Sequence, residues 1–531
     1  MGTLNAFYAP IYGEIEEVVL HWYKRKVISG RSFEELFEVE GFPLGWFYEK
    51  IFFTVMMPRY LNIYDILKNK KNLTFLKKSE LLFYSSILPK LVLFNERKKI
   101  TVSRKKSRTP TQQQKVLLLT FTNHLQSDGK IYRFQSIIDE LFHRNKIIPF
   151  PVTVDQFSSR KYQKLKTTTT TTIYQYSDKE IVQKANKKSK EMYQQIHSLS
   201  EEQKRNIFST KDKNFWPYCK YLFNFHFSKE MLFQTLFHYY LFDKIIREER
   251  IICALLTSPS SVTEKCLIAA AKNNNIPALV VQHGMGLFHH PFNENHGNPH
   301  FAVFGEYHYK QTLDSGIPKE NIHITGPVIY NDIFAYKGRD SEKKRKNGKK
   351  IKEILITTQN VVEVDLITKK EYFESLKKII VTLQSIPKVK ITIKTHPQEI
   401  YLQDYDSLAH QFRNVSSNHL KGNENLYTLL SQCDLLINFY GTSTVLEAAI
   451  LDKPSMTIDL PNLTQNFYQD YDPSYRIKYE AGRIKEAVQE MLEKPHLLQE
   501  KRERLVREWC YVIDGKAHQR VVDVIEKLSK K

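Results

Sequence analysis

Cysteine is scarce in this sequence. The chain has five cysteines in 531 residues, and none of them forms a CxxC pair. They are Cys219, Cys253, Cys266, Cys433 and Cys510. Structural zinc sites and disulfide frameworks need paired or regularly spaced cysteines, so the sequence argues against both. We therefore expect a chain that works in a reducing compartment, without a structural metal.

Long apolar runs are also missing near the N-terminus. The strongest run there, residues 51–57, ends at Pro58 and is far shorter than the ~20 residues that a membrane helix requires. Residues 1–13 lack both the basic start and the apolar stretch of a signal peptide. We therefore expect a cytoplasmic chain.

Acidic residues are fewer than basic ones. The chain has 79 Lys and Arg against 58 Asp and Glu, a formal net charge of +21. Such an excess favours anionic partners such as nucleotide phosphates, an acidic membrane surface or nucleic acid, although a solvated basic surface is the alternative. No known RNA- or DNA-binding motif is present, so we expect no nucleic-acid partner.

An aromatic segment lies within the N-terminal region. Residues 46–57 combine Trp and Phe side chains with the neighbouring cations Lys50 and Arg59. This pattern fits a helix packed on the main body, or an interfacial helix lying peripherally on an anionic membrane.

Apolar β-branched runs alternate with helical patterns over most of the chain, which is typical of parallel α/β domains. The first set of expected strands comprises 116–122, 147–152, 251–256, 278–281, 301–305 and 322–327. The second comprises 353–356, 389–393, 435–437 and 455–458. We expect an α/β fold with two Rossmann-like domains that face a cleft.

The remaining segments fit around these two domains. The expected boundaries are a helical extension with a basic linker at 1–110, a first domain with a helical insertion at 111–336, a basic linker at 337–352, a second domain at 353–505 and a C-terminal helix at 506–531. The six-threonine tract 167–172 is expected to form an exposed loop or an irregular strand.

A glycine and three hydroxyl residues follow one strand of the second domain. Gly441 permits a tight turn, after which Thr442, Ser443 and Thr444 stand at a helix N-terminus. Free N–H groups and the helix dipole favour a phosphate there, and Glu447 is placed to accept hydrogen bonds from a ribose. The alternative needs no ligand, because Thr444 and Glu447 also fit a capping box.

A second strand end carries Lys394, Thr395, His396 and Pro397. Pro397 cannot continue a central strand, so His396 is held at the sheet edge, where its imidazole can donate to a phosphate. Lys394 lies two residues earlier and shares its side of the strand. The alternative is a histidine that hydrogen-bonds to a neighbouring loop.

A third strand end, in the first domain, carries Gln282, His283 and Gly284. With an ordinary pKa near 6.5, His283 suits a general base for an acceptor hydroxyl. His289, His290 and His296 follow, but their spacing is not that of zinc ligands, so we expect no metal.

The order of these motifs resembles the GT-B glycosyltransferases, in particular the capsule and surface-polysaccharide branch with Kdo-, sialyl- and glycerophosphotransferase-like members. Those proteins carry a QHG-type segment in the N-domain, a His-Pro pair in the C-domain, and a Ser/Thr-rich turn before a helix with Glu-Ala. The UDP-GlcNAc 2-epimerases share this layout. The resemblance covers residues 250–470 well, and 115–155 by pattern alone.

The resemblance implies roles for individual residues. His396 and the hydroxyls of Ser443 and Thr444 would bind the donor phosphate, Glu447 the ribose, and His283 the acceptor or leaving-group side. Many sialyltransferase-like members have a Ser-Ser pair where this chain has Ser443-Thr444. The acidic base of some families is not assignable, and Asp128 is the positional candidate.

We therefore expect a glycosyltransferase that moves a sugar or polyol phosphate from a nucleotide-activated donor to a surface polysaccharide, glycan or lipid-linked acceptor, with no cofactor or obligatory metal. The first alternative is a nonhydrolysing nucleotide-sugar epimerase, which needs acidic residues for C–H proton abstraction. The second is a basic nucleic-acid-binding protein.

Two Asp-Tyr-Asp triplets, at 404–406 and 470–472, match the metal-binding DxD pattern of the other glycosyltransferase fold. Neither follows an apolar strand as that role requires, so we interpret both as loop carboxylates.

Overall fold

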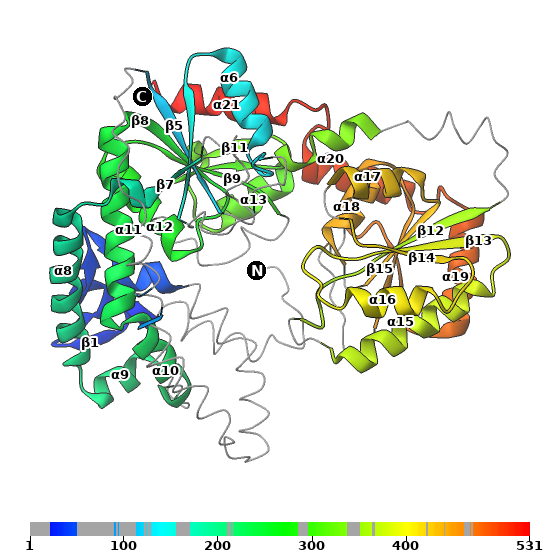
Figure 1. The fold of residues 1–531 in the computed structure, drawn as a ribbon, viewed down its shortest axis with the longest axis horizontal. Helices are drawn as coiled ribbons and strands as arrows, with labels where there is room; N and C mark the ends of the chain where they lie inside the picture. The colour runs from blue at the N-terminus through cyan, green and yellow to red at the C-terminus, as the bar shows by residue number, and fades with distance from the viewer. Residues whose placement is uncertain are drawn as a thin grey trace. The chain divides into compact units, whose positions relative to one another are not determined.

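The computed structural model describes residues 22–49, 90–91, 94, 113–121, 124, 129–154, 170–209, 214, 216–284, 296–336, 351–363, 367–420, 423–439, 441–460, 468 and 471–530. The chain forms two compact units (Figure 1). Unit 1 comprises Met1–Ala302, Lys310–His323 and Val521–Lys531, and unit 2 comprises Val303–Tyr309 and Ile324–Arg520. Each unit is built around its own parallel sheet.

The sheet of unit 1 has seven strands in the order β11-β10-β9-β8-β5-β6-β7. Their bounds are β5 Lys115–Thr120, β6 Ile148–Thr153, β7 Thr171–Thr172, β8 Ile251–Leu256, β9 Ala278–Val281, β10 His300–Val303 and β11 Ile322–Ile324. All six residues of β5 are buried, because helices cover both faces of a parallel sheet. The strand order reverses between β5 and β8, so the crevice outside their carboxyl ends is the expected ligand site.

Helices and short elements complete unit 1. They are η1 Trp22–Lys24, β1 Lys26–Ile28, β2 Arg31–Ser32, α2 Phe33–Leu36, β3 Glu38–Val39, β4 Phe42–Pro43, α6 Gln135–Arg144, η4 Ile173–Tyr176, α8 Lys179–His197, α9 Glu201–Ile207, α10 Trp216–His226, α11 Lys229–Glu248, α12 Val262–Asn273 and η5 Lys319–Asn321. Helix α13 (Glu306–Asp314) and helix α21 (Ala517–Leu528) each contribute to both units. Helix α11 packs against α8 and α12, which explains why it is buried along most of its length.

The sheet of unit 2 has six strands, all parallel, in the order β14-β13-β12-β15-β16-β17. Their bounds are β12 Lys352–Thr357, β13 Val389–Lys394, β14 Val415–Asn418, β15 Leu435–Phe439, β16 Ser455–Asp459 and β17 Tyr475–Lys478. The helices are η6 Val328–Tyr330, η7 Asp332–Tyr336, α15 Lys369–Gln384, α16 Leu402–Ala409, α17 Asn423–Gln432, α18 Ser443–Ile450, α19 Ala481–Glu493 and α20 Gln499–Cys510. The strand order reverses between β12 and β15.

The prediction of two Rossmann-like α/β domains is confirmed, but several details differ. The described part of the N-terminal region, residues 22–49, contains two short antiparallel hairpins in addition to short helical turns and a helical stretch at 44–49. The chain passes from one compact unit to the other at residues 303, 310, 324 and 521. The linker expected at 337–352 stays a prediction, because 337–350 lies outside the described residues.

Three further expectations can be compared with the structure. Thr171 and Thr172 of the threonine tract are buried and form β7, which pairs with β6. Trp46 is also buried, with its ring 5.8 Å from that of Phe42, so the described part of the aromatic segment packs on the body. Residues 50–57 lie outside the described residues.

In place of one C-terminal helix, α20 ends at Cys510 and α21 begins at Ala517.

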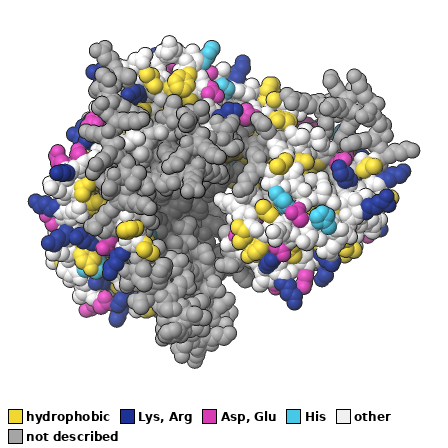
Figure 2. Space-filling view, in the orientation of Figure 1, with side chains coloured by type: hydrophobic (Ala, Val, Ile, Leu, Met, Phe, Trp, Pro, Cys, Tyr) yellow, Lys and Arg dark blue, Asp and Glu magenta, His cyan; other side chains and the backbone are white. Residues whose placement is uncertain are grey.

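Two features of the described surface bear on partners. Among the side chains that Figure 2 colours by type, Lys and Arg are interspersed with Asp and Glu. Across the residues that the structure describes, every helix is too short or too polar to cross a membrane.

Candidate functional site

The turn after β15 positions the start of α18 at the switch point of unit 2. Gly441 has φ +67°, in the left-handed region that glycine adopts without strain. Thr442 is the N-cap, and its Oγ1 accepts a hydrogen bond from the Thr444 N–H at 3.2 Å. Ser443 is the first helical residue and is exposed. The exposed hydroxyl therefore stands at the positive end of the helix, where an anion is stabilised.

Glu447 does not take part in a capping box. The cap is Thr442, so the residue three positions into the helix is Val445 and not an acid. The Glu447 side chain is only 6% exposed, and its Oε2 has no hydrogen-bond partner in the described structure. Burial raises the pKa of this carboxyl to about 8. Because buried polar atoms are nearly always hydrogen-bonded, an unpaired carboxyl oxygen beside a switch point indicates a place for a ligand.

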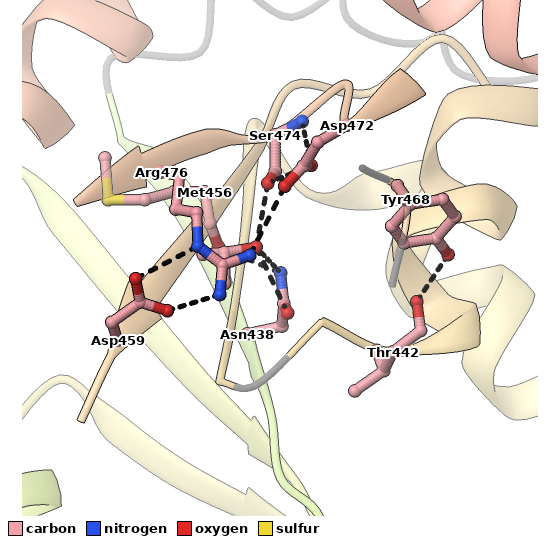
Figure 3. A network of polar contacts seen from close by, with 9 residues as sticks. Asn438, Thr442, Met456, Asp459, Tyr468, Asp472, Ser474 and Arg476 are labelled. Atoms are coloured by element: carbon pink, nitrogen blue, oxygen red, sulfur yellow. Dashed lines mark hydrogen bonds and ion pairs between the residues drawn. The ribbon is translucent and has the colours of Figure 1, made fainter. Parts of the chain in front are cut away.

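Tyr468 fixes the first turn of α18. Its hydroxyl donates to the Thr442 carbonyl at 2.6 Å and accepts from the Leu446 N–H at 3.2 Å. In a regular helix the Leu446 N–H would bond directly to the Thr442 carbonyl, four residues earlier. Here the hydroxyl of Tyr468 lies between these two groups and bridges them. Figure 3 shows Tyr468 reaching Thr442 from the side. No sequence pattern marks this tyrosine, and we did not predict it.

Two threonines at the end of β12 connect the α18 turn with the β13 turn. Thr357 Oγ1 lies 3.2 Å from Thr444 Oγ1. Thr358 Oγ1 donates to Glu399 Oε2 at 2.6 Å and accepts from the His396 N–H at 3.1 Å. Neighbouring strands are about 4.8 Å apart, so the ends of β13 and β15, on either side of β12, are separated by roughly 10 Å. The two predicted motifs therefore share one sheet edge.

His396 is half-buried at this edge with a defined tautomer. Its Nδ1 accepts a hydrogen bond from the Gln398 N–H at 3.2 Å, so the neutral ring carries its proton on Nε2. Burial, and then the charge of Lys394, lowers its pKa. The ring is therefore a neutral N–H donor. Lys394 itself is buried, its Nζ donates to the Thr395 carbonyl at 2.9 Å, and burial lowers its pKa.

Glu399 holds the His396 turn and was missed from the sequence. Its carboxylate accepts hydrogen bonds from the His396 N–H at 2.8 Å, from the Tyr405 hydroxyl at 2.6 Å and from Thr358. Burial raises its pKa to about 7, although all three hydrogen bonds oppose the rise. A carboxylate three residues after a strand-end histidine is the signal that could have identified it.

His283 stands at the end of β9 in unit 1. Its Nδ1 donates to the Thr257 carbonyl at 2.6 Å, so in the neutral ring the lone pair is on Nε2, as a general base requires. Gln282 is buried and holds the turn, because its side-chain N–H donates to the Gly284 carbonyl at 3.0 Å. Among the described residues, no atom lies within 4 Å of a Cβ built at Gly284.

Two further residues lie beside His283. Arg133, just before α6, donates from Nη1 to Thr257 Oγ1 at 3.2 Å. His124, after β5, is 6% exposed, and burial, Arg133 and His283 together lower its pKa to about 3. Neither residue was predicted, although His124 lies in the polar loop that follows the first expected strand. Asp128, from the same loop, lies outside the described residues.

Metal ligands are not grouped in the described ranges. No set of three or more His, Cys, Asp or Glu residues within them is placed to hold a metal ion. His296 packs edge-on against Trp46, with ring centroids 5.6 Å apart. His289 and His290 lie outside these ranges.

The Asp-Tyr-Asp triplets have structural partners. Asp404 and Asp406 lie in α16, so the loop interpretation was wrong for them. They pair with Lys369 Nζ at 2.8 Å and with His419 Nε2 at 2.8 Å, respectively. This placement follows from the amphipathic pattern of α16, which we did not recognise.

The second triplet is described only in part. Asp472 accepts from Ser474 Oγ at 2.6 Å and lies 3.4 Å from Arg476, which also forms a two-pronged ion pair with Asp459 (Figure 3). Asp470 lies outside the described residues.

Comparison with known proteins finds a family model that is similar to the second part of the chain. Residues 298–526, less than half of the chain, match the family model of UDP-N-acetylglucosamine 2-epimerase. No curated protein matches.

Several solved structures are similar. UDP-GlcNAc 2-epimerase from Neisseria meningitidis bound to UDP-GlcNAc is 14% identical, with 78% of this chain and 100% of that chain covered and a TM-score of 0.47. UDP-GlcNAc 2-epimerase from Methanocaldococcus jannaschii is also 14% identical, with 78% of this chain and 100% of that chain covered and a TM-score of 0.48. Acinetobacter baumannii MurG is 14% identical, with 78% of this chain and 99% of that chain covered and a TM-score of 0.41. Over residues 298–526, this chain is thus similar to the UDP-N-acetylglucosamine 2-epimerases, and it resembles the GT-B superfamily in having two Rossmann-like α/β units.

Proposed function

We propose that this protein is a glycosyltransferase that uses a nucleotide-activated sugar or polyol, and that unit 2 binds the nucleotide of the donor. Three features of one sheet edge support this: the helix start at Ser443, the N–H donor on His396 and the unpaired carboxyl oxygen of Glu447. The family match at 298–526 covers all three residues. N–H and hydroxyl groups at a helix start bind the phosphates of a nucleotide, and a carboxyl oxygen accepts hydrogen bonds from the hydroxyls of its ribose.

The buried carboxyl of Glu447 is the observation that carries the proposal. A carboxyl held in an apolar site with one unpaired oxygen costs stability, because that oxygen has lost its water without gaining a partner. Its alternative role in a capping box is excluded by the cap at Thr442. A ribose hydroxyl bound to Glu447 would supply the missing hydrogen bond.

We propose different roles for the two histidines in the transfer, and the hydrogen bonds of their rings support these roles. His283 would take the proton of an acceptor hydroxyl on Nε2 while the Thr257 carbonyl holds the opposite nitrogen. As the new glycosidic bond forms, the bond to the nucleotide phosphate breaks. His396 and the hydroxyls of Ser443 and Thr444 would stabilise the charge that develops on the departing phosphate. We propose no cofactor and no obligatory metal.

A nonhydrolysing epimerase is the second candidate, and the family match favours it. That reaction needs acidic residues that remove and return a proton on carbon. The groups that the structure brings to the described switch point of unit 1 are instead His124, Arg133 and His283. Glu264 is buried nearby, but it accepts from the Ser261 N–H at 2.9 Å in a capping box. We therefore favour the transferase.

The direct test is titration calorimetry with CMP, CDP, UDP and GDP. We expect at least one to bind, and His396→Ala and Ser443→Ala each to weaken its binding by roughly 1.5–3 kcal/mol, the value of one charge-assisted hydrogen bond. Ser407→Ala, at an exposed serine on α16, is the control that should leave affinity unchanged. Affinities unchanged in both site variants would place the nucleotide elsewhere.

We also propose a cytoplasmic, peripheral position on an anionic membrane, where a surface-polysaccharide or lipid-linked acceptor is within reach. With Trp46 buried, this rests on the net charge of +21. Flotation with anionic vesicles should show salt-sensitive binding, and equal recovery with neutral vesicles would contradict it.

A further inference from the structure

The switch point of unit 1 brings Arg133 and His283 to one threonine, Thr257, and His124 lies close to both of them. Thr257 follows β8, its hydroxyl accepts from Arg133 Nη1 at 3.2 Å, and its carbonyl accepts from His283 Nδ1 at 2.6 Å. His124 follows β5, the neighbouring strand, and is close enough for the charges of Arg133 and His283 to lower its pKa. One residue therefore holds the guanidinium beside the proposed base.

The positive charge of Arg133 is poorly compensated in the described structure. The side chain is half-buried, burial lowers its pKa, and the Thr257 hydroxyl is its one hydrogen-bond partner among the described residues. The carboxylate of Glu264, which lies close enough to favour the charged guanidinium, is held by the Ser261 N–H. Among the described residues this partly desolvated cation has no direct ion-pair partner, which is unfavourable, so an anion bound beside it would be stabilised.

His124 gives a second, independent indication. Its side chain is 6% exposed and its Nδ1 has no hydrogen-bond partner in the described part of the chain. Its ring packs edge-on against Phe121, with centroids 5.5 Å apart, which fixes the ring without satisfying that nitrogen. A buried ring nitrogen of this kind is satisfied by a ligand that brings its own hydrogen-bonding group.

We propose that this edge of unit 1 binds an anionic group of the acceptor, either a phosphate monoester or a carboxylate. The inference rests on the proposed transferase function and specifies the class of its acceptor. A guanidinium recognises both groups through parallel N–H···O bonds, and the neutral ring of His124 can donate to the same anion when its single ring proton is on Nδ1. Because Thr257 bonds to both Arg133 and His283, an anion on Arg133 holds the acceptor molecule beside the base.

The experiment compares three probes that share one sugar: glucose 1-phosphate, glucuronic acid and neutral glucose. Binding to the full-length wild type, Arg133→Gln and His124→Asn is measured by calorimetry at low salt. Arg205→Gln, which removes a cation from the exposed face of α9, is the matched control. Thermal unfolding of every variant checks that it is folded.

We expect an anionic probe to bind the wild type at least tenfold more tightly than glucose. Arg133→Gln should weaken that probe about 10- to 100-fold, the loss of one charge-assisted hydrogen bond, and His124→Asn should weaken it in the same direction. Which probe binds distinguishes phosphate from carboxylate. Equal binding of all three probes, or an equal loss in Arg205→Gln, would overturn the proposal.

A nucleotide titration of the same variants separates this proposal from the donor site. Arg133→Gln should bind the nucleotide as the wild type does, whereas Ser443→Ala should bind the anionic probe normally. If no nucleotide binds the wild type but the anionic probe does, the proposed function fails and the anion site stands. If Arg133→Gln loses nucleotide and anionic probe together, the anion site belongs to the donor, and an acceptor site is contradicted.

Discussion

Replacing Glu447 by glutamine should change how stability depends on pH. The carboxyl is buried, and its pKa is raised from 4.5 to about 8. Between these values the folded protein keeps the proton and the unfolded chain releases it. Because the native state then binds more protons, the free energy of unfolding falls as pH rises from about 4.5 to 8. The full loss is on the order of 5 kcal/mol, at about 1.4 kcal/mol per pH unit.

The assay is urea unfolding of the wild type and of Glu447→Gln at intervals between about pH 5 and pH 9, where this ionisation should govern the difference between them. Glutamine is neutral and similar in shape, so the two proteins should have similar stability at the acidic end. The variant should become progressively more stable than the wild type toward pH 8. The exposed Glu493→Gln on α19 is the control and should follow the wild type. Parallel curves for wild type and Glu447→Gln would refute the reasoning.

The same carboxyl predicts a proton linked to nucleotide binding. If the carboxylate of Glu447 accepts ribose hydroxyls, binding favours the ionised form and must release a proton near pH 7. Calorimetry in two buffers of different ionisation enthalpy should detect this release in the wild type and not in Glu447→Gln. Proton uptake, or no exchange in the wild type, would remove Glu447 from the ribose site.

Three further predictions concern the two sheet edges. Glu399→Gln should weaken nucleotide binding about tenfold, the cost of a disturbed charge-assisted hydrogen bond, because the His396 turn loses its carboxylate acceptor; calorimetric affinity equal to the wild type would show that the turn holds without it. His283→Ala should keep its donor affinity while turnover falls by roughly 10²–10⁴-fold, as for a positioned base, and normal turnover would reduce His283 to a strand-end residue. Turnover should survive EDTA; loss that Mg²⁺ or Mn²⁺ restores would contradict the metal-independent proposal.

The buried strands could be predicted from the sequence because of where they lie in the sheets. Strands β8 and β9 have the same bounds as the expected strands 251–256 and 278–281, because central parallel strands are covered on both faces and appear in the sequence as continuous apolar runs. The edge strands β14 and β17 escaped this pattern, and β7 lies in the threonine tract for which the sequence left a loop and an irregular strand open. Val415–Asn418 is only partly buried, and Thr171–Thr172 lies within a low-complexity tract, so neither gives a hydrophobic signal.

The site could be predicted where one short segment carries the chemistry. His396, Ser443 and Glu447 follow recognisable strand ends, and the structure brings the two turns to one edge through Thr357 and Thr358. Residues that act through packing across long sequence separations were missed. Arg133 meets Thr257 across 124 positions, and Tyr468 enters the α18 turn from 26 positions away.

Asp128 as a base stays a prediction, because this residue lies outside the described residues. A shared cleft for both sheet edges also stays a prediction, because the fold of either unit does not test it.

Incubation with a panel of nucleotide sugars in ²H₂O, without acceptor, tests the transferase assignment most directly. A transferase breaks the bond between the sugar and the phosphate and leaves every carbon-bound hydrogen of the donor in place. An epimerase that works by C–H abstraction exchanges one of them with solvent. For a nucleotide sugar that the protein binds, mass spectrometry should therefore find an unlabelled sugar. Deuterium on a sugar carbon in the absence of acceptor would contradict the account.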